Sequence, residues 1–125
     1  MFQWIRNEAR QPSATIYITN ITLNRTAMDL LENSPYVMLG INMGTRQVAI
    51  KPVSTQDIKS GLVANDELYK VSNGRSYGRI ANRNFCTLIN RSFGLQLNNE
   101  DGKKFPIFYD TDGKTLIVDF AGGEM

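Results

Sequence analysis

Two eleven-residue segments of this chain resemble each other, and this internal repeat limits the possible folds more than any other feature. Residues 24–34 (Asn-Arg-Thr-Ala-Met-Asp-Leu-Leu-Glu-Asn-Ser) align with residues 82–92 (Asn-Arg-Asn-Phe-Cys-Thr-Leu-Ile-Asn-Arg-Ser), 58 positions later, with four identities. Unrelated segments of this length share about one identity. The repeat therefore predicts two copies of one structural unit in the same chain.

Each copy has the pattern of a short amphipathic helix, with apolar residues at positions i, i+3 and i+4. These residues are Ala27, Leu30 and Leu31 in the first copy, and Phe85, Leu88 and Ile89 in the second. Asn24 and Asn82 precede the two segments, at the position where an asparagine side chain accepts from free backbone N–H groups. We expect two capped helices of about ten residues, held by packing rather than by propensity.

The flanking sequence predicts strands around both helices. A β-branched and aromatic run at 14–19 precedes the first helix, and strands at 36–41 and 46–53 follow it as a hairpin. Asn73-Gly74 predicts a hairpin before the second helix, and strands at 105–109 and 114–120 follow that helix. An insert near 95–104 in the second half adds a strand and a turn to the prediction.

One domain accommodates both copies, because about 55 residues per copy are too few to bury separate cores. We divide it into an N-terminal arm (1–13), repeat one (14–53), a linker (54–66), repeat two (67–120) and a tail (121–125). The expected fold class is a β-rich α+β domain of two tandem strand-helix-hairpin repeats with pseudo-twofold symmetry. The shared core is either a barrel or a sandwich of two sheets with a helix at each end.

Composition excludes several classes of protein. The 125 residues are 42% hydrophobic and 21% charged, which is typical of a globular domain. A single cysteine and the absence of histidine exclude an internal disulfide and catalysis through a Ser-His or Cys-His pair. No apolar run approaches the roughly 18 residues of a membrane helix, and no signal-peptide pattern is present, so we expect a cytoplasmic protein without a membrane partner.

Two motifs have simple structural interpretations. Cys86 adjoins the apolar face of the second helix and lacks a histidine partner, so we expect a core residue rather than a nucleophile. Asp110-Thr111-Asp112-Gly113 matches the start of a calcium loop, but the later ligands are missing, so it predicts a hairpin turn. We expect no catalytic residue, no metal and no cofactor.

Positive charge is concentrated in one part of a chain whose formal net charge is only +2. No acidic residue occurs from Leu68 to Asn99, whereas Lys70, Arg75, Arg79, Arg83 and Arg91 lie there. Such a segment attracts phosphate, or else forms a solvated surface. Our candidate nucleic-acid-binding residues are Lys70, Arg75, Arg79, Arg83 and Arg25.

Arg25 and Arg83 occupy equivalent positions in the two copies. Each lies in the first turn of a helix, where a cation opposes the helix dipole by a few tenths of a kcal/mol. The two arginines are therefore expected to serve the same purpose, and two alternatives for that purpose remain open. Each arginine pairs with a carboxylate of the other half, or both join a phosphate-contacting face.

Two resemblances extend these inferences. The run Ile21–Leu31, followed by Tyr36–Leu39 and Val48–Pro52, resembles a group of small bacterial and phage proteins of unassigned function. The order strand, short helix, hairpin resembles the half-barrel unit of the AbrB/MraZ class of transcription regulators. That resemblance implies two units in one compact barrel and arginines on one face that bind DNA.

We therefore expect a small non-catalytic DNA-binding or regulatory protein of AbrB/MraZ-like architecture, with duplex DNA as its partner. The alternative is a non-catalytic oligomerisation or interaction module of a mobile element or phage. A third hypothesis is a barrel that binds a small molecule or has a minor enzymatic activity. Open strand edges and the apolar N-terminal arm also predict a homodimer.

Overall fold

Short strands make up most of the regular structure in the computed structural model, which describes residues 1–4 and 11–125. In chain order these are β1 Ser13–Ile16, β2 Ile21–Asn24, β3 Tyr36–Asn42, β4 Gln47–Pro52, β5 Tyr69–Lys70, β6 Ser72–Asn73, β7 Tyr77–Ile80, β8 Lys103–Asp110 and β9 Thr115–Asp119. The helices are α1 Arg25–Leu30, α2 Thr55–Lys59 and α3 Arg83–Phe93, with a 3₁₀ turn at Asn65–Glu67. The fold is β-rich α+β, as predicted.

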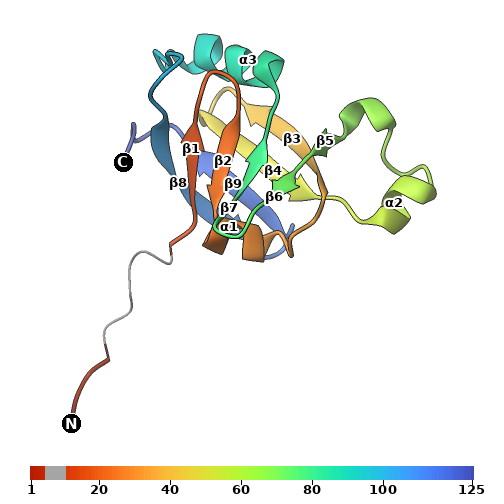
Figure 1. The fold of residues 1–125 in the computed structure, drawn as a ribbon, viewed down its shortest axis with the longest axis horizontal. Helices are drawn as coiled ribbons and strands as arrows, with labels where there is room; N and C mark the ends of the chain where they lie inside the picture. The colour runs from red at the N-terminus through yellow and green to blue at the C-terminus, as the bar shows by residue number, and fades with distance from the viewer. Residues whose placement is uncertain (5–10) are drawn as a thin grey trace.

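The strands form one antiparallel sheet that nearly closes into a barrel (Figure 1). Neighbouring strands follow the order β5-β3-β4-β9-β8-β1-β2-β7-β6. The two end strands, β5 and β6, are separated in the chain by Val71 alone. Val71 is buried, and its N–H donates to the carbonyl oxygen of Pro35 at 2.8 Å. The same stretch of chain therefore pairs with β3 on one side and with β7 on the other.

The core lies inside this barrel and follows from period-two alternation along the strands. Alternate residues of β1, β2, β4 and β9 are almost completely buried, and they are Ala14, Ile16, Ile21, Leu23, Val48, Ile50, Leu116 and Val118. The rings of Phe93, Phe105 and Phe120 pack against one another at centroid distances of 5.2 and 4.6 Å. Residues from both halves of the chain thus share one core.

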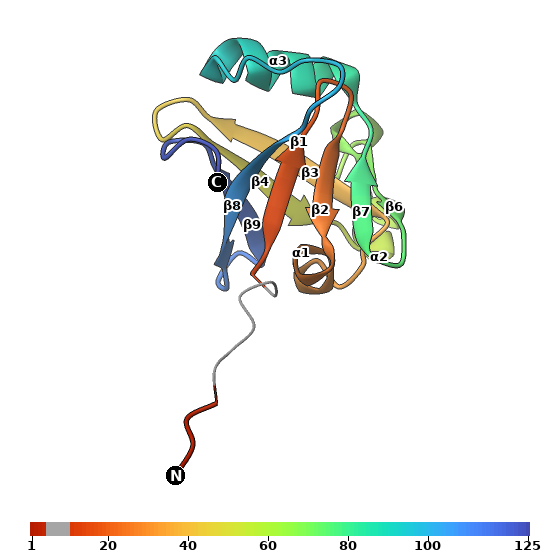
Figure 2. The same cartoon turned by 60° about the vertical axis from the view of Figure 1, so that its left-hand side comes forward.

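Helices α1 and α3 lie at opposite ends of the barrel (Figure 2). The predicted caps are confirmed, because the Asn24 side chain accepts from the N–H of Ala27 at 3.0 Å and the Asn82 side chain accepts from Phe85 at 2.9 Å. Both helices turn their apolar side toward the sheet. Packing against the strands therefore compensates for the short length of α1, which has six residues.

The structure corrects three details of the sequence analysis. β2 was not predicted, so the first half contains a hairpin before its helix instead of a single strand, as the second half was expected to. Leu88 is 37% exposed, because α3 buries Cys86 and Phe93 together with Phe85 and Ile89. No strand forms between residues 95 and 102, where the predicted insert strand was expected.

The connecting segments also differ from plain loops. The linker contains α2 and the 3₁₀ turn, which project from one side of the barrel (Figure 1). Ser54 caps α2 by accepting from the N–H of Asp57 at 3.0 Å. Of the expected N-terminal arm, residues 5–10 lie outside the described part of the chain, and Ser13 belongs to β1. No helix among the described residues is long and apolar enough to cross a membrane.

Candidate nucleic-acid interface

A row of cationic and hydroxyl side chains crosses the outer face of the sheet. Arg79 of β7 lies opposite both Ser72 of β6 and Thr22 of β2. Thr22 lies opposite Thr15 of β1, which in turn lies opposite Lys104 of β8. The neighbours of Arg79, Thr22 and Thr15 along their strands are buried, as are Val71 beside Ser72 and Phe105 beside Lys104, so the row points toward solvent. We call Ser72, Arg79, Thr22, Thr15 and Lys104 the polar row.

The spacing of the polar row follows from the strand spacing. Adjacent strands lie about 4.8 Å apart, so Arg79 and Lys104, three strands apart, are separated by about 14 Å. The strands β1, β2, β6 and β7 contain no Asp or Glu. The row therefore places two threonine side chains between two positive charges, with no carboxylate in these four strands to repel an anion. The Thr22 hydroxyl donates to the Asn20 side chain at 2.8 Å in this structure.

Arg75 and Arg79 share a hollow at the β6–β7 hairpin. It has a volume of about 510 Å³ and is lined by hairpin residues that include Ser72, Tyr77 and Ala81. The Arg79 guanidinium lies 5.5 Å from the centroid of the Tyr77 ring and donates to the Tyr77 hydroxyl oxygen at 3.4 Å. Tyr77 is 42% exposed. The ring therefore restrains a cation that still faces solvent.

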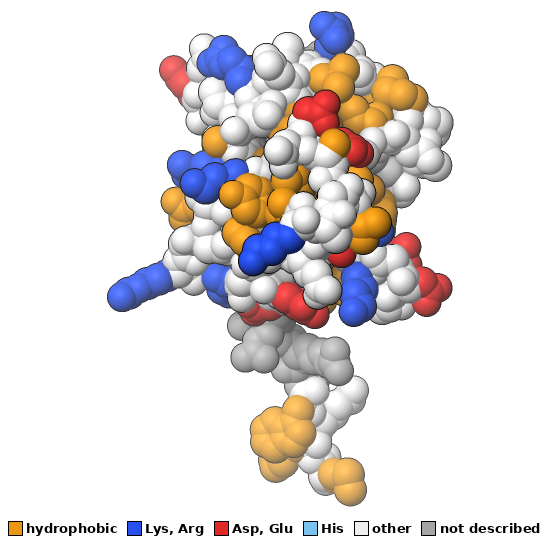
Figure 3. All heavy atoms as spheres, turned by 90° about the vertical axis from the view of Figure 1, so that its right-hand side faces the viewer, with side chains coloured by type: hydrophobic (Ala, Val, Ile, Leu, Met, Phe, Trp, Pro, Cys, Tyr) orange, Lys and Arg blue, Asp and Glu red, His pale blue; other side chains and the backbone are white. Residues whose placement is uncertain are grey.

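Lys70 lies at the same edge of the barrel, on β5. It lines a neighbouring hollow of about 200 Å³ that also contains Ser72 and Ala81. Because the two hollows share these residues, the structure brings Lys70, Arg75 and Arg79 to one side of the barrel. Lys and Arg side chains on the side that carries β5 and α2 stand apart, with hydrophobic side chains between them (Figure 3). The basic surface is therefore a set of separate charges rather than a continuous patch.

Arg25 has structural contacts. Its guanidinium forms an ion pair with Asp29 at 3.1 Å, donates to the carbonyl oxygen of Gly74 at 3.1 Å and contacts the Asn33 side chain. The carboxylate belongs to its own helix, whereas the contact to the other half is a backbone carbonyl. The interpretation that Arg25 pairs with a carboxylate of the other half is therefore wrong. Arg25 is thereby the least accessible of the five candidates to a phosphate.

Arg83 does not share these contacts. It is the first residue of α3, at the other end of the barrel from α1 (Figure 2). Its predecessor Asn82 lines the hollow that contains Lys70. Among the described residues the only ion pair joins Arg25 and Asp29, so Lys70, Arg75, Arg79 and Arg83 have no carboxylate partner there. The five candidates thus divide into one structural arginine and four exposed cations.

Lys104 was missed by the sequence analysis. Its position before buried Phe105 in an alternating strand indicates an outward side chain, which is a signal that the sequence contains. Its place beside Thr15 depends on the β1–β8 register, and no local pattern encodes that register. Lys104 therefore joins the candidate set only once the sheet is known.

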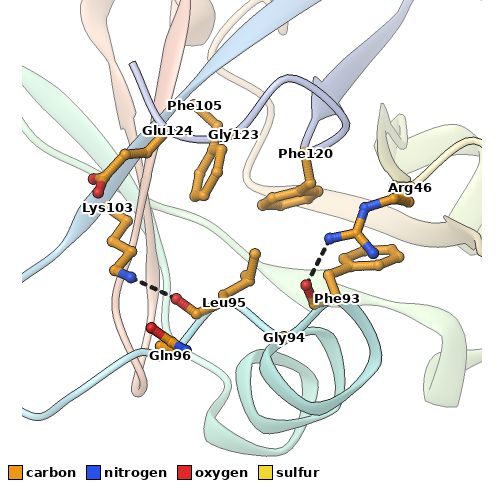
Figure 4. Close-up of a pocket in the computed structure, with 10 residues that line it drawn as sticks. All are labelled: Arg46, Phe93, Gly94, Leu95, Gln96, Lys103, Phe105, Phe120, Gly123 and Glu124. Atoms are coloured by element: carbon orange, nitrogen blue, oxygen red, sulfur yellow. Dashed lines mark hydrogen bonds between the residues drawn. The ribbon is translucent and has the colours of Figure 1, made fainter.

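A third hollow, at the carbonyl end of α3, has a structural explanation (Figure 4). It measures about 300 Å³, and Phe105 and Phe120 line it. Arg46 donates to the carbonyl oxygen of Phe93 at 2.6 Å, and the Lys103 ammonium donates to that of Leu95 at 2.6 Å. Arg46 thus neutralises the negative end of the helix dipole, and Lys103 binds the chain two residues beyond the helix.

The remaining candidate groups have the structural roles expected of them. Cys86 is buried, and burial raises the pKa of its thiol to about 11. The Asp110 side chain accepts from the N–H groups of Asp112 at 3.1 Å and Gly113 at 3.4 Å, which makes this segment a hairpin turn. In the described part of the chain, no group of three or more metal-ligating side chains converges.

Comparison with known proteins gives no match to a family model, to a curated protein or to a solved structure.

Proposed function

We propose that this protein is a small non-catalytic nucleic-acid-binding protein that contacts the phosphates of duplex DNA with the outer face of β6, β7, β2, β1 and β8. The observation that carries the proposal is the position of Arg79. It lies in the polar row between the hydroxyl side chains of Ser72 and Thr22, restrained by Tyr77 and without a carboxylate partner among the described residues. Charged hydrogen bonds from such groups position a protein on the DNA backbone.

The number of cations determines how tight this binding is. Lys70, Arg75, Arg79 and Lys104 allow about three or four phosphate contacts, so log K falls with log salt with a slope of about −3 to −4. Complexes with so few contacts are weak at physiological salt. We therefore expect binding that is readily measured at about 20 mM salt and largely lost by 200 mM, with little dependence on base sequence.

We also infer that the two halves of the chain are copies related by a pseudo-twofold axis, as in the AbrB/MraZ class that the sequence resembles. The strand ladders support this inference. Strands β2 and β7, which precede the two helices, pair with each other, and strands β4 and β9, which end the two later hairpins, pair about Ala49 and Ile117. Ala49 and Ile117 each lie three residues after the positive-φ residue of their own turn, Arg46 and Lys114. An antiparallel pair of equivalent strands centred on equivalent residues has local twofold symmetry.

The helices and turns support the same relation. Ala27, Met28 and Leu31 are buried in the first copy, and Phe85, Cys86 and Ile89 are buried 58 positions later. Arg46 and Lys114 close the two second hairpins with φ of 56° and 50°. In both turns a side-chain oxygen accepts from the backbone N–H three residues later, Asn42 from Thr45 and Asp110 from Gly113.

A titration with a fluorescently labelled 20-base-pair duplex tests the proposed function. The wild-type chain, Arg79→Gln and Arg75→Gln are compared by anisotropy at about 20 mM salt. Each of the two substitutions removes one positive charge and with it one phosphate contact. We therefore expect each to weaken DNA binding at least threefold. Lys114→Asn is the matched control, since it removes one charge from the β8–β9 turn and asparagine tolerates positive φ.

Two results contradict the proposal. One is the absence of binding by the wild-type chain at low salt, where electrostatic attraction is strongest. The other is an equal loss of affinity in Arg79→Gln and in Lys114→Asn, which indicates attraction by net charge alone. A single-stranded oligonucleotide of the same length serves as a second ligand. Tighter binding to the single strand assigns the exposed Tyr77 to base stacking and rejects the duplex as the preferred form.

The alternative function, an interaction module, is favoured by a different observation. The β4–β9 pair lies on the side of the barrel opposite the β2–β7 pair, four strands away in either direction around the sheet. The outer face of β4 and β9 carries the apolar pair Ala49 and Ile117, whereas the outer face of β2 and β7 carries the polar pair Thr22 and Arg79. The two faces therefore suit different partners.

A further inference from the structure

An apolar row crosses the outer face of β3, β4, β9 and β8. Gly40 lies opposite Ala49, Ala49 opposite Ile117, and Ile117 opposite Phe108. The residues that alternate with these along β4 and β9 are buried, so the row points away from the core. Phe108 is 56% exposed, which is unusual for a phenylalanine on a sheet face. We call Gly40, Ala49, Ile117 and Phe108 the apolar row.

Opposite charges flank the apolar row on its two sides. Lys51 points outward two residues beyond Ala49, and Asp119 points outward two residues beyond Ile117. Because β4 and β9 run antiparallel, these two residues lie on opposite sides of the row. Neither takes part in an ion pair within the described part of the chain. The positive charge of Lys51 and the negative charge of Asp119 thus lie on opposite sides of the Ala49–Ile117 pair, each two residues away from it.

We propose that this face binds a second copy of the same chain, face to face, with Lys51 of each copy against the partner's Asp119. The relevant twofold axis lies in the plane of the interface, perpendicular to the line from Lys51 to Asp119. A rotation of 180° about this axis places each of the two charges over the position of the other. The surface is therefore complementary to itself, which is the condition for a closed symmetric dimer.

The same rotation brings apolar surface together. The axis runs nearly along the apolar row, so the row of one copy covers the row of the other, and strand β8 lies over the β8 of the second copy. The exposed Phe108 rings of the two copies then meet near the axis. Each ring loses its contact with water and packs against the other ring. The inference does not depend on nucleic-acid binding, because the centres of the two rows, on β2–β7 and on β4–β9, lie on opposite sides of the barrel. The rows share only β8, where Lys104 precedes Phe108 by four residues.

The size of the face predicts weak association. The four strands of the apolar row lie about 4.8 Å apart and span about 14 Å across the sheet. The flanking charges lie two residues to either side of the row, so they are separated by about 14 Å along the strands. This central area is well below the roughly 800 Å² per partner of a standard interface. We therefore expect a concentration-dependent equilibrium between monomer and dimer rather than an obligate dimer, and the experiment must cover concentrations from about 10 µM to 1 mM.

Sedimentation equilibrium of the full chain tests the proposal with charge reversal. Lys51→Glu and Asp119→Lys each place like charges together in the homodimer, and each is expected to weaken self-association at least tenfold. An equimolar mixture of the two variants pairs opposite charges again and is expected to associate like the wild type. The matched control is Lys114→Glu, which makes the same charge change in the β8–β9 turn outside this face.

Asp119 also accepts from the N–H of Ala121 at 3.3 Å, so its variant is checked for folding by thermal melting. If that variant does not fold, Phe108→Glu replaces it, because it brings two carboxylates together at the axis and is expected to abolish association. A wild-type chain that stays monomeric up to 1 mM overturns the proposal. So does association that survives charge reversal and Phe108→Glu but is lost when residues 1–4 are deleted, since the exposed Phe2 and Trp4 are then the adhesive segment.

Discussion

The guanidinium of Arg25 donates to the carbonyl oxygen of Gly74 at 3.1 Å and so joins α1 to the β6–β7 hairpin. The contact spans the two halves of the chain. It holds the hairpin, which carries Arg75, Tyr77 and Arg79, against α1. The apolar side of α1 in turn packs into the core. The Asn73 side chain adds a second link, because it donates to the carbonyl oxygen of Asn33 at 3.4 Å. Stability at one end of the barrel and the position of the candidate phosphate contacts are therefore coupled.

Removal of this side chain by Arg25→Met is expected to lower the free energy of unfolding by about 1 kcal/mol. The partly exposed ion pair with Asp29 contributes little, and the hydrogen bond to Gly74 contributes most of the loss. Urea denaturation measures the change. Arg83→Met is the control, and its unfolding free energy is expected to stay within about 0.5 kcal/mol of wild type. Equal losses in both variants contradict the structural role of Arg25.

Substitution by glycine of Arg46 and Lys114, the positive-φ residues of the two later hairpins, is expected to change the stability in opposite directions. Lys114→Gly relieves the left-handed conformation and stabilises the protein by about 0.5–1 kcal/mol. Arg46→Gly relieves the same conformation but loses the hydrogen bond to the Phe93 carbonyl and the contact with the Phe93 ring, so it destabilises. Thermal melting of both variants checks this prediction, and stabilisation by Arg46→Gly removes the assigned role of Arg46 at α3.

Gly78 is expected to be intolerant of any side chain. A Cβ at this position meets Met28, with Cε at 2.8 Å and Cγ at 2.9 Å, and Met28 is completely buried. Gly78→Ala therefore destabilises by overpacking, by about 1–3 kcal/mol. Met28→Ala makes room at the cost of a cavity, so the double variant should be no less stable than Met28→Ala alone. Additive losses, measured by urea denaturation, contradict a direct contact.

Burial of Cys86 predicts a change of stability with pH. Its pKa is raised from 9.0 to about 11 in the folded protein, so above pH 9 the thiol ionises in the unfolded chain first. The stability contribution is fully present below pH 9 and is lost between pH 9 and 11, by about 1–3 kcal/mol. Urea denaturation of wild type and Cys86→Ala across this range measures the difference. A pH dependence that is unchanged in Cys86→Ala contradicts the assignment.

Local features of the fold were predictable from the sequence, and long-range features were not. Asn24 and Asn82 act within three residues, so their caps follow from the segment itself. β2 has only four residues and forms a hairpin with β1, but its other partner, β7, lies more than fifty positions away and could not be read from the local sequence. In the sequence, Leu88 and Cys86 fit an apolar helix face equally well. In the folded protein Phe93 is buried, and this decides which face of α3 is turned toward the core.

The candidate site divides in the same way. The acid-free stretch identified Lys70, Arg75 and Arg79, which the structure brings to one side of the barrel. It also included Arg25, whose neutralising partner Asp29 is four residues away on the same helix and was available in the sequence as an i, i+4 pair. Lys104, Thr15 and Thr22 join the polar row through three strand registers that only the folded sheet defines.

The most direct test of the account is a nuclear magnetic resonance titration of the labelled protein with a short duplex at low salt. We expect the largest amide shifts at Arg79, Thr22, Thr15 and Lys104, with smaller changes at Ala49 and Ile117 on the opposite face. These shifts should disappear as salt is raised to about 200 mM. Shifts that are confined to the opposite face, or no shifts at all at low salt, contradict the assignment of the polar row as a nucleic-acid interface.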